Sequence, residues 1–194
     1  MSETRIIVLV SAMAGGKDTL LNKVVNTYGI NKMVSDTTRP PREHEICAKD
    51  YYFITEEMFS QRQEYEQYIE VRGYDTAHGK WYYGLPKGEI LEGVANIVIV
   101  DAKGCDEVKE YCNSKGYKCI SIYLKCSFEK RIKRYMDRDK MNDKQVIEMA
   151  RRMIDDYNNV EPYSKWCDYV WWNETESDLM LNMIKIGDMI NVRE

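Results

Sequence analysis

A glycine-rich segment near the start of the chain limits the possible folds more than any other feature. Residues 10–20 read V-S-A-M-A-G-G-K-D-T-L and join an apolar run, residues 6–10, to a segment whose apolar residues recur at helical spacing. Glycines that open a helix direct backbone N–H groups toward one point, where the helix dipole favours an anion and a lysine adds positive charge. The segment therefore predicts a phosphate-binding loop between a buried strand and a helix.

The match to the usual phosphate-loop pattern, G-x-x-x-x-G-K-[ST], is partial. Gly16 and Lys17 fit it, whereas Ser11 stands at the first glycine position and Asp18 at the hydroxyl position. Thr19 supplies a hydroxyl one residue later. An ordinary glycine-containing turn from strand to helix is the alternative, and spacing alone leaves both open.

Length and charge set broad limits on the class of protein. A chain of 194 residues fits a single domain, and its 28 basic and 32 acidic residues give a net charge of −4, which provides no overall positive field for nucleic acid. The longest apolar runs, residues 6–10 and 97–100, are too short to span a bilayer, and the N-terminus lacks the layout of a signal peptide. We expect a cytoplasmic protein, a monomer or homodimer, that binds small molecules and neither membrane nor nucleic acid.

The cysteines show a regular spacing that invites a metal site. Cys105, Cys112, Cys119 and Cys126 recur every seven residues. The spacing crosses a predicted helix into a predicted strand and includes no C-x-x-C pair, which argues against metal binding. Without a secretion signal we expect reduced, buried thiols.

Short apolar runs alternate with helical patterns along the chain. Strands are predicted at residues 6–10, 51–54, 96–100, 118–124 and 169–172, and helices at residues 17–28, 56–65, 128–135, 146–157 and 179–190. Such alternation predicts an α/β fold, a parallel sheet with helices on both faces. Asp101 follows a predicted strand and is therefore expected at the carboxyl edge of the sheet, where open α/β folds bind ligands.

Two further segments carry arginines suited to phosphate. Residues 34–45 read V-S-D-T-T-R-P-P-R-E-H-E, in which the prolines hold Arg39 and Arg42 close together on extended backbone, and Ser35 adds a hydroxyl. A solvated basic turn is the alternative. Arg131, Arg134 and Arg138 fall on one face of the helix near residue 130, and the next helix carries a basic pair, Arg151 and Arg152. This helical pair is either a lid over a phosphate site or a solvated surface.

Taken in order, these motifs resemble the guanylate kinase family. V-S-D-T-T-R-P-P-R followed by D-Y-Y-F is similar to the family signature, and the order of loop, signature, glutamate, Y-Y-G, D-x-x-G, arginine-rich lid and D-Y-V-x-x-N runs through residues 5–190. The resemblance implies a single guanylate-kinase-like domain with a P-loop NTPase core and a three-layer parallel sheet. The core would comprise residues 1–33, 96–125 and 163–194, with an inserted nucleotide-binding lobe, residues 34–95, and a helical lid, residues 126–162.

The resemblance also implies an activity and its residues: ATP-dependent phosphorylation of GMP or dGMP with Mg²⁺. The acceptor nucleotide would be held by Ser35, Arg39, Arg42, Tyr51, Glu70, Tyr83 and Asp101, with Glu70 on the guanine ring and Asp101 between the two substrates. ATP would be held by Ala14, Gly15, Gly16, Lys17, Asp18, Thr19 and Asn173, the last near adenine. Lys17, Arg134, Arg138 and Arg152 would be catalytic, and Mg²⁺ would be bound through the ATP phosphates with help from Asp18 or Thr19.

The chain departs from the family pattern at the base site. Leu85 replaces the hydroxyl of Y-G-[ST], which also contacts guanine in the family, and the loop at residues 72–80 is longer than usual. Asp75, Thr76 and His78 are candidates to restore a polar contact. Base identity therefore stays open.

Two other functions remain possible on this pattern. One is a kinase of the same fold that acts on ribose 1,5-bisphosphate or another nucleoside monophosphate, against which Arg42, Tyr51 and Glu70 favour GMP. The other is a non-catalytic phosphopeptide-binding module. Lys17 argues against such a module, whereas Ser11 and Asp18 leave it open.

Overall fold

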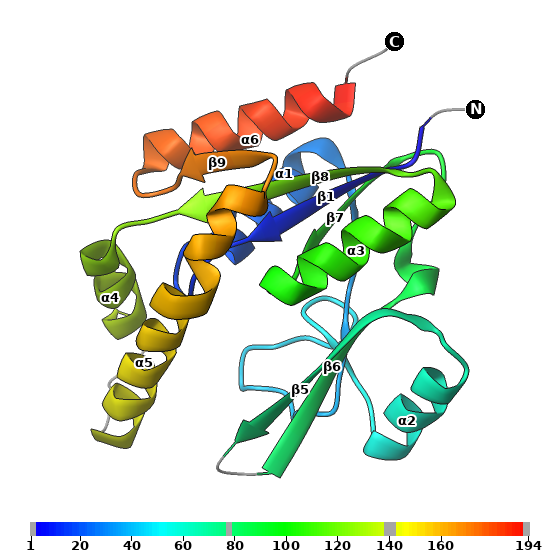
Figure 1. Ribbon diagram of the computed structural model, residues 1–194. Coiled ribbons are helices and arrows are strands. Elements are labelled where there is room, and N and C mark those ends of the chain that lie inside the picture. Colours follow the sequence, from blue (N-terminus) through cyan, green and yellow to red (C-terminus); the bar gives the residue numbers. More distant parts are fainter. Residues whose placement is uncertain (1–2, 77–78, 138–142, 192–194) are drawn as a thin grey trace.

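The central element is a five-stranded parallel sheet in the computed structural model, which describes residues 3–76, 79–137 and 143–191. Its strands are β1 (Arg5–Val10), β2 (Asn31–Lys32), β7 (Ala95–Ile99), β8 (Lys118–Lys125) and β9 (Tyr169–Trp172). They lie in the order β2-β7-β1-β8-β9, and every neighbouring pair is parallel (Figure 1). The predicted parallel sheet is confirmed. The short polar strand β2 was not predicted.

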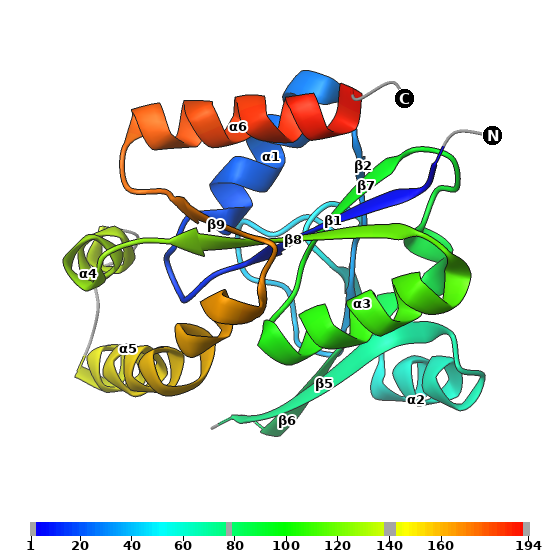
Figure 2. The same cartoon turned by 45° about the horizontal axis from the view of Figure 1, so that its top comes forward.

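Helices cover both faces of this sheet, which explains why residues 6–10 of β1 are all apolar. Ile6, Val8 and Val10 pack on the side of α3 (Ala102–Lys115), and Ile7 and Leu9 on the side of α1 (Lys17–Tyr28) and α6 (Glu176–Asn191). Figure 2 shows α1 and α6 on one side of the sheet and α3 on the other. The core therefore has the three layers expected of the P-loop NTPase fold.

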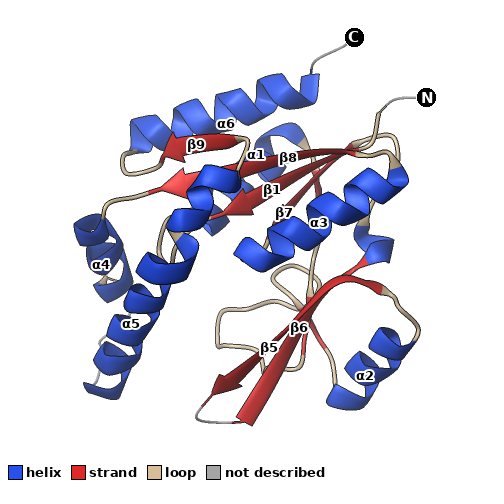
Figure 3. Ribbon diagram, in the orientation of Figure 1, coloured by secondary structure: helices blue, strands red, loops and turns tan. Residues whose placement is uncertain are grey.

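A smaller sheet lies below the α3 side of the central sheet in Figure 3. It contains β3 (Asp36–Thr37), β4 (Tyr52–Phe53), β5 (Tyr68–Thr76) and β6 (Gly79–Pro86) in the order β4-β3-β6-β5, and β5 and β6 form an antiparallel hairpin. The helix α2 (Glu56–Glu64) is capped by Thr55, whose hydroxyl accepts a hydrogen bond from the Met58 N–H. The short turn η1 (Lys87–Glu89) leads back to the central sheet.

Two helices lie beyond one end of the central sheet (Figure 1). They are α4 (Phe128–Met136) and α5 (Asp143–Asp155), and α5 continues into the π-helical turn η2 (Asp156–Val160) and the turn η3 (Pro162–Trp166). Both predicted helices are confirmed, while the polar break between them lies largely outside the described residues. No helix in the described part of the chain has the length and apolar character needed to cross a membrane.

The thiols are distributed between core and surface. All six cysteines are free; Cys105 and Cys112 are buried as expected, Cys119 and Cys126 are half-buried, and Cys47 is exposed. Among the described residues no cluster of histidine, cysteine and carboxylate side chains could hold a metal ion. Cys105 and Cys112 thus belong to the core on the α3 side of the sheet, and Cys119 packs against it.

Candidate functional site

The glycine-rich loop turns sharply between β1 and α1. Ala14 and Gly16 both have left-handed backbone, with φ of 59° and 90°, and no side chain caps the first turn of α1. A Cβ atom on Gly16 would lie 2.5 Å from Nδ2 of Asn173, and one on Gly15 would lie 2.7 Å from Oγ of Ser11. Both glycines are therefore required, and the uncapped N–H groups of α1 remain available to an anion.

Ala14 gives a small test of the loop geometry. A left-handed backbone costs an alanine about 1 kcal/mol, whereas glycine adopts it freely. We expect Ala14→Gly to raise the free energy of unfolding by about 0.5 kcal/mol once the greater freedom of the unfolded chain is subtracted. Urea denaturation would measure this change. Ala150→Gly in the exposed helix α5 is the matched control and should lower stability by about 1 kcal/mol; equal losses in both variants would contradict the strained loop.

Side chains from distant parts of the chain hold the backbone of this loop. Nδ2 of Asn173, just after β9, donates to the Gly15 carbonyl at 2.9 Å. On α4, Arg134 donates to the carbonyls of Ala14 at 3.4 Å and Asn173 at 2.9 Å. The structure thus places Asn173 and Arg134 beside the phosphate loop, where they support its shape.

A buried ion cluster, formed by Arg131, Asp156 and Glu161, fixes the loop at Met13. Asp156 accepts the Met13 N–H at 2.7 Å, and Arg131 donates to the Met13 carbonyl at 2.9 Å. The Arg131 side chain is only 1% exposed and forms ion pairs with Asp156 at 2.8 Å and Glu161 at 2.6 Å. Helical spacing placed Arg131 on the same face as Arg134, but nothing local in the sequence indicated its acidic partners, Asp156 on η2 and Glu161 between η2 and η3.

The first turn of α1 carries the charges expected to meet ATP. Lys17 is half-buried and has no hydrogen-bond partner in the described part of the chain, and Asp18 and Thr19 are exposed. Burial raises the pKa of Asp156, while the Met13 N–H, Arg131 and Lys17 oppose that rise. Burial, together with the charges of Tyr83 and Asp18, raises the pKa of Tyr51 to about 12. The charge of Lys17 thus acts on Asp156 in the buried ion cluster, and the charge of Asp18 acts on Tyr51 in a second site.

That second site is an arginine pocket in the smaller sheet. Arg39 is buried; its Nε donates to the Tyr83 hydroxyl at 3.2 Å, and its guanidinium carbon lies 5.5 Å from the centre of the Tyr51 ring. Both terminal nitrogens of Arg39 donate to the Glu45 carboxylate at 2.8 Å. The backbone N–H of Arg42 donates to the same carboxylate at 2.8 Å, while the Arg42 guanidinium remains exposed. The Glu45 carboxylate thus occupies the guanidinium fork of Arg39 and fixes its orientation.

Glu45 was not predicted as part of the site, although it stands in the signature segment. Burial alone would raise its pKa, but hydrogen bonds from Arg39 and the Arg42 N–H hold the pKa of Glu45 below its ordinary value. Ser35 is half-buried, and its carbonyl accepts the Tyr52 N–H at 3.0 Å, which places Ser35 beside β4. The Glu45 carboxylate thus holds the Arg39 side chain and the Arg42 backbone in place.

A buried carboxylate lies on the face of β5 next to this pocket. Glu70 is 6% exposed, and burial raises its pKa to about 7, although the charge of Arg72 opposes that rise. A Cβ atom on Gly104 would come within 3.3 Å of Glu70 Oε2 and 3.2 Å of Asp101 Oδ1. The glycine of D-x-x-G is therefore needed for Glu70 and Asp101 to approach α3 together.

Asp101 joins the central sheet to the hairpin. It caps α3 by accepting the Gly104 N–H at 2.7 Å, and it also accepts from Arg72 at 3.2 Å and from the Tyr74 hydroxyl at 2.8 Å. Asp101 thus lies at the carboxyl edge of the sheet, as expected. Arg72 and Tyr74 are additions that the sequence pattern did not indicate.

The remaining predicted residues lie elsewhere or cannot be placed. Arg152 is exposed on α5 and donates to Glu148 of the same helix at 2.7 Å. Arg138 and His78 lie outside the described residues, as does the side chain of Thr76, and Asp75 is exposed. Asn173 and Arg134 thus contact the loop, and Asp101 contacts Arg72, which lies 3.8 Å from Glu70. Arg39, Tyr51 and Tyr83 form a cluster at the smaller sheet, and Arg152 pairs within α5.

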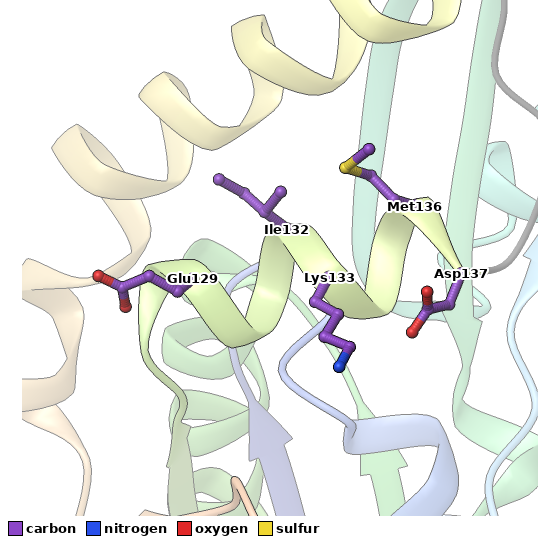
Figure 4. Close-up of a pocket in the computed structure, with 5 residues that line it drawn as sticks. All are labelled: Glu129, Ile132, Lys133, Met136 and Asp137. Atoms are coloured by element: carbon purple, nitrogen blue, oxygen red, sulfur yellow. The ribbon is translucent and has the colours of Figure 1, made fainter.

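A hollow of about 410 Å³ lies apart from these groups, on the surface of α4. Figure 4 shows Ile132 and Met136 pointing from the same side of the helix, with Glu129, Lys133 and Asp137 around them. None of the predicted site residues lines it. The hollow is wide open and its polar side chains do not converge on one point, so it is not a candidate active site.

Comparison with known proteins identifies the family of the chain. The family model described as guanylate kinase matches residues 3–183. The guanylate kinase of Clostridium acetobutylicum is 29% identical over 99% of this chain and 90% of its own length, and that of Malacoplasma penetrans is 31% identical over 76% and 74%. A crystal structure of guanylate kinase from Anaplasma phagocytophilum superposes with a TM-score of 0.70 at 23% identity, covering 97% of this chain and 85% of that one. The chain belongs to the guanylate kinase family.

Proposed function

We propose that this protein transfers the γ-phosphoryl group of ATP to GMP or dGMP. The observation that carries the proposal is the buried Arg39, which contacts Tyr51 and Tyr83 beside the small sheet that also carries the buried carboxylate of Glu70. A nucleoside monophosphate has a phosphate that would bind at Arg39 and base N–H groups that would bind at Glu70. Membership of the guanylate kinase family supports guanine as the base.

The acceptor would be held at both of its ends. Arg39, Arg42, Tyr51, Tyr83 and Ser35 would bind its phosphate, and an ionised Glu70 would accept N–H groups of the base. Asp101, which lies at the sheet edge beside Arg72, would stand between the two substrates. Fixing both ends of the acceptor lowers the entropic cost of reaching an in-line geometry.

The donor would lie on the phosphate loop. The N–H groups of Ala14, Gly15, Gly16 and the first turn of α1, with Lys17, would surround the ATP phosphates, and Asn173 would border this site. Asp18 and Thr19 offer the hard oxygen ligands that Mg²⁺ prefers, and the bound ion would supply further positive charge to the phosphates. Arg134, Arg138 and Arg152 are the proposed lid arginines.

Different segments of the chain would hold the substrates and enclose them. Residues 34–95 would form the acceptor lobe and residues 126–162 a lid, both attached to the core comprising residues 1–33, 96–125 and 163–194. Closing such a lid excludes water and so limits hydrolysis of ATP. A cytoplasmic location, where ATP and nucleoside monophosphates are available, is part of the proposal.

A substrate panel tests this function. ADP release coupled to a spectrophotometric readout would be measured with GMP, dGMP, AMP, UMP, CMP and ribose 1,5-bisphosphate as acceptors. We expect turnover with GMP and dGMP and at least tenfold lower kcat/KM for the others, because a buried acceptor left without its partner rejects a wrong base. Preference for ribose 1,5-bisphosphate would identify the related kinase, and binding without turnover of any acceptor would identify the non-catalytic module.

Glu70 predicts a pH dependence of acceptor binding. With its pKa raised to about 7, the carboxyl group is largely protonated at pH 6 and ionised at pH 8. Base N–H groups need the ionised form, so KM for GMP should fall roughly tenfold between about pH 6 and pH 8. Steady-state kinetics at each pH would measure it.

Glu70→Gln is the control for this pH profile. It should bind GMP more weakly and retain only the pH dependence due to the substrate phosphate, which itself titrates near pH 6. Identical profiles for the wild-type protein and Glu70→Gln would show that Glu70 does not titrate in this range.

A further inference from the structure

The position that opposes Glu70 across the hairpin supplies no hydrogen-bond donor. Leu85 on β6 pairs in register with Glu70 on β5, so the two side chains share a face of the sheet. Leu85 is fully buried and packs in the core with Val100 and Cys105. A base that reaches Glu70 therefore meets a hydrocarbon side chain where a hydroxyl would otherwise stand.

Arg72 lies on the same face of β5, two residues beyond Glu70, and most of its donors are occupied. Nε donates to Asp101 Oδ1 at 3.2 Å, and Nη1 donates to the two Glu107 oxygens at 3.1 and 3.0 Å. Nη1 also lies 3.8 Å from Oε2 of Glu70. Two carboxylates of α3 and its cap thus fix the guanidinium plane beside Glu70.

The third guanidinium nitrogen of Arg72, Nη2, differs from Nε and Nη1. Nη2 is buried and has no hydrogen-bond partner among the described residues. A buried, charged N–H group without an acceptor is unfavourable, and native proteins rarely keep one without a ligand, an ion or water to satisfy it. A donor held in this way next to a base-binding carboxylate indicates that the ligand brings the acceptor.

We infer that Arg72 is a base-specificity residue, whose Nη2 donates a hydrogen bond to the 6-carbonyl oxygen of the acceptor guanine. The inference rests on the proposed function and adds to it. Guanine carries the acceptor O6 beside N–H donors on one edge, which complements a guanidinium beside a carboxylate. Adenine presents an amino donor at position 6, which would face the Arg72 donor without forming a bond.

The geometry also explains why the fork of an arginine is needed. Glu107 and Asp101 occupy two nitrogens of the guanidinium plane, and the third remains fixed in direction. Lysine has one flexible ammonium group and cannot satisfy both carboxylates while holding a donor toward a base. Arg72→Lys is therefore expected to behave like a loss of the base contact although it keeps the charge near Glu70.

The test compares kcat/KM for four acceptors: GMP, 6-thio-GMP, IMP and AMP. Sulfur at position 6 is a weak acceptor, so 6-thio-GMP reports the Arg72 contact, whereas IMP lacks only the 2-amino group and reports Glu70. We expect the wild-type protein to prefer GMP over 6-thio-GMP by about 10- to 100-fold. In Arg72→Met and Arg72→Lys this ratio should fall close to one, with the GMP-to-IMP ratio unchanged and the rejection of AMP weakened.

The control is Arg151→Met, which removes an exposed arginine whose ion pair is with Glu148 on the same helix. It should leave the three ratios, GMP to 6-thio-GMP, GMP to IMP and GMP to AMP, at their wild-type values. If Arg72→Met folds poorly, Arg72→Lys and thermal unfolding with and without GMP provide the comparison. A GMP-to-6-thio-GMP ratio that stays at its wild-type value in Arg72→Lys, or an equal loss for all four acceptors, would overturn the inference. No turnover of GMP by the wild-type protein would instead overturn the proposed function, and this inference with it.

Discussion

Lys17→Ala is expected to lower kcat by about 10³-fold while the Kd for GMP changes less than about threefold. Lys17 stands at the first position of α1, directly after Gly16, where the uncapped helix N-terminus would hold the donor phosphates. Its ammonium group would neutralise charge on the moving phosphoryl group, and no other lysine lies in the loop. In the proposed function GMP would bind through the smaller sheet and would not need this group.

Two measurements separate these effects. Coupled ADP release gives kcat, and calorimetric titration of GMP gives Kd. Lys23→Ala, on the same helix, is the matched control, because Lys23 is exposed and pairs with Glu176 at 2.7 Å. Near-normal turnover by Lys17→Ala would show that the loop has been assigned the wrong role.

Arg131→Met is expected to lower the free energy of unfolding by about 3 kcal/mol or more. The variant leaves the Asp156 carboxylate without its cation and the Met13 carbonyl without its donor. Water can replace the lost guanidinium only poorly at these two groups, because the Arg131 side chain is only 1% exposed. The loop should also lose its fixed shape, so KM for ATP should rise more than KM for GMP.

Urea denaturation measures the stability change, and Arg151→Met serves again as the matched arginine. Its ion pair with Glu148 is exposed on α5, and exposed pairs contribute less than about 1 kcal/mol. Equal stability losses in the two variants would show that the buried ion cluster does not hold the loop. Equal increases in KM for both substrates would show that its effect is not directed at the donor site.

Periodicity predicted the large elements because each one is a local pattern. The apolar run of β1 and the helical spacing of α1 were visible in the sequence. The sequence did not distinguish the hairpin of β5 and β6 from a lengthened loop at residues 72–80, and the structure shows paired strands there. β2 was missed because two polar residues form it, and only pairing with β7 makes it a strand.

The residues of the candidate site also fall into two groups, those that a local motif predicted and those that it did not. The loop, Arg39, Glu70 and Asp101 stand in short motifs whose spacing carries chemical meaning. Arg131 and Arg72 do not, because their roles depend on partners far away in the chain: Met13 and Asp156 for Arg131, and Asp101 and Glu107 for Arg72. Such long-range pairs leave no periodic signal, and only the folded chain brings them together.

The most direct test of the proposed reaction is the fate of a labelled γ-phosphate. The wild-type protein would be incubated with γ-³²P-labelled ATP, Mg²⁺ and GMP, and the products separated by chromatography. We predict that the label appears in GDP, at a rate that depends on GMP. Label recovered only as inorganic phosphate, or retained in ATP, would contradict phosphoryl transfer between the loop and the arginine pocket.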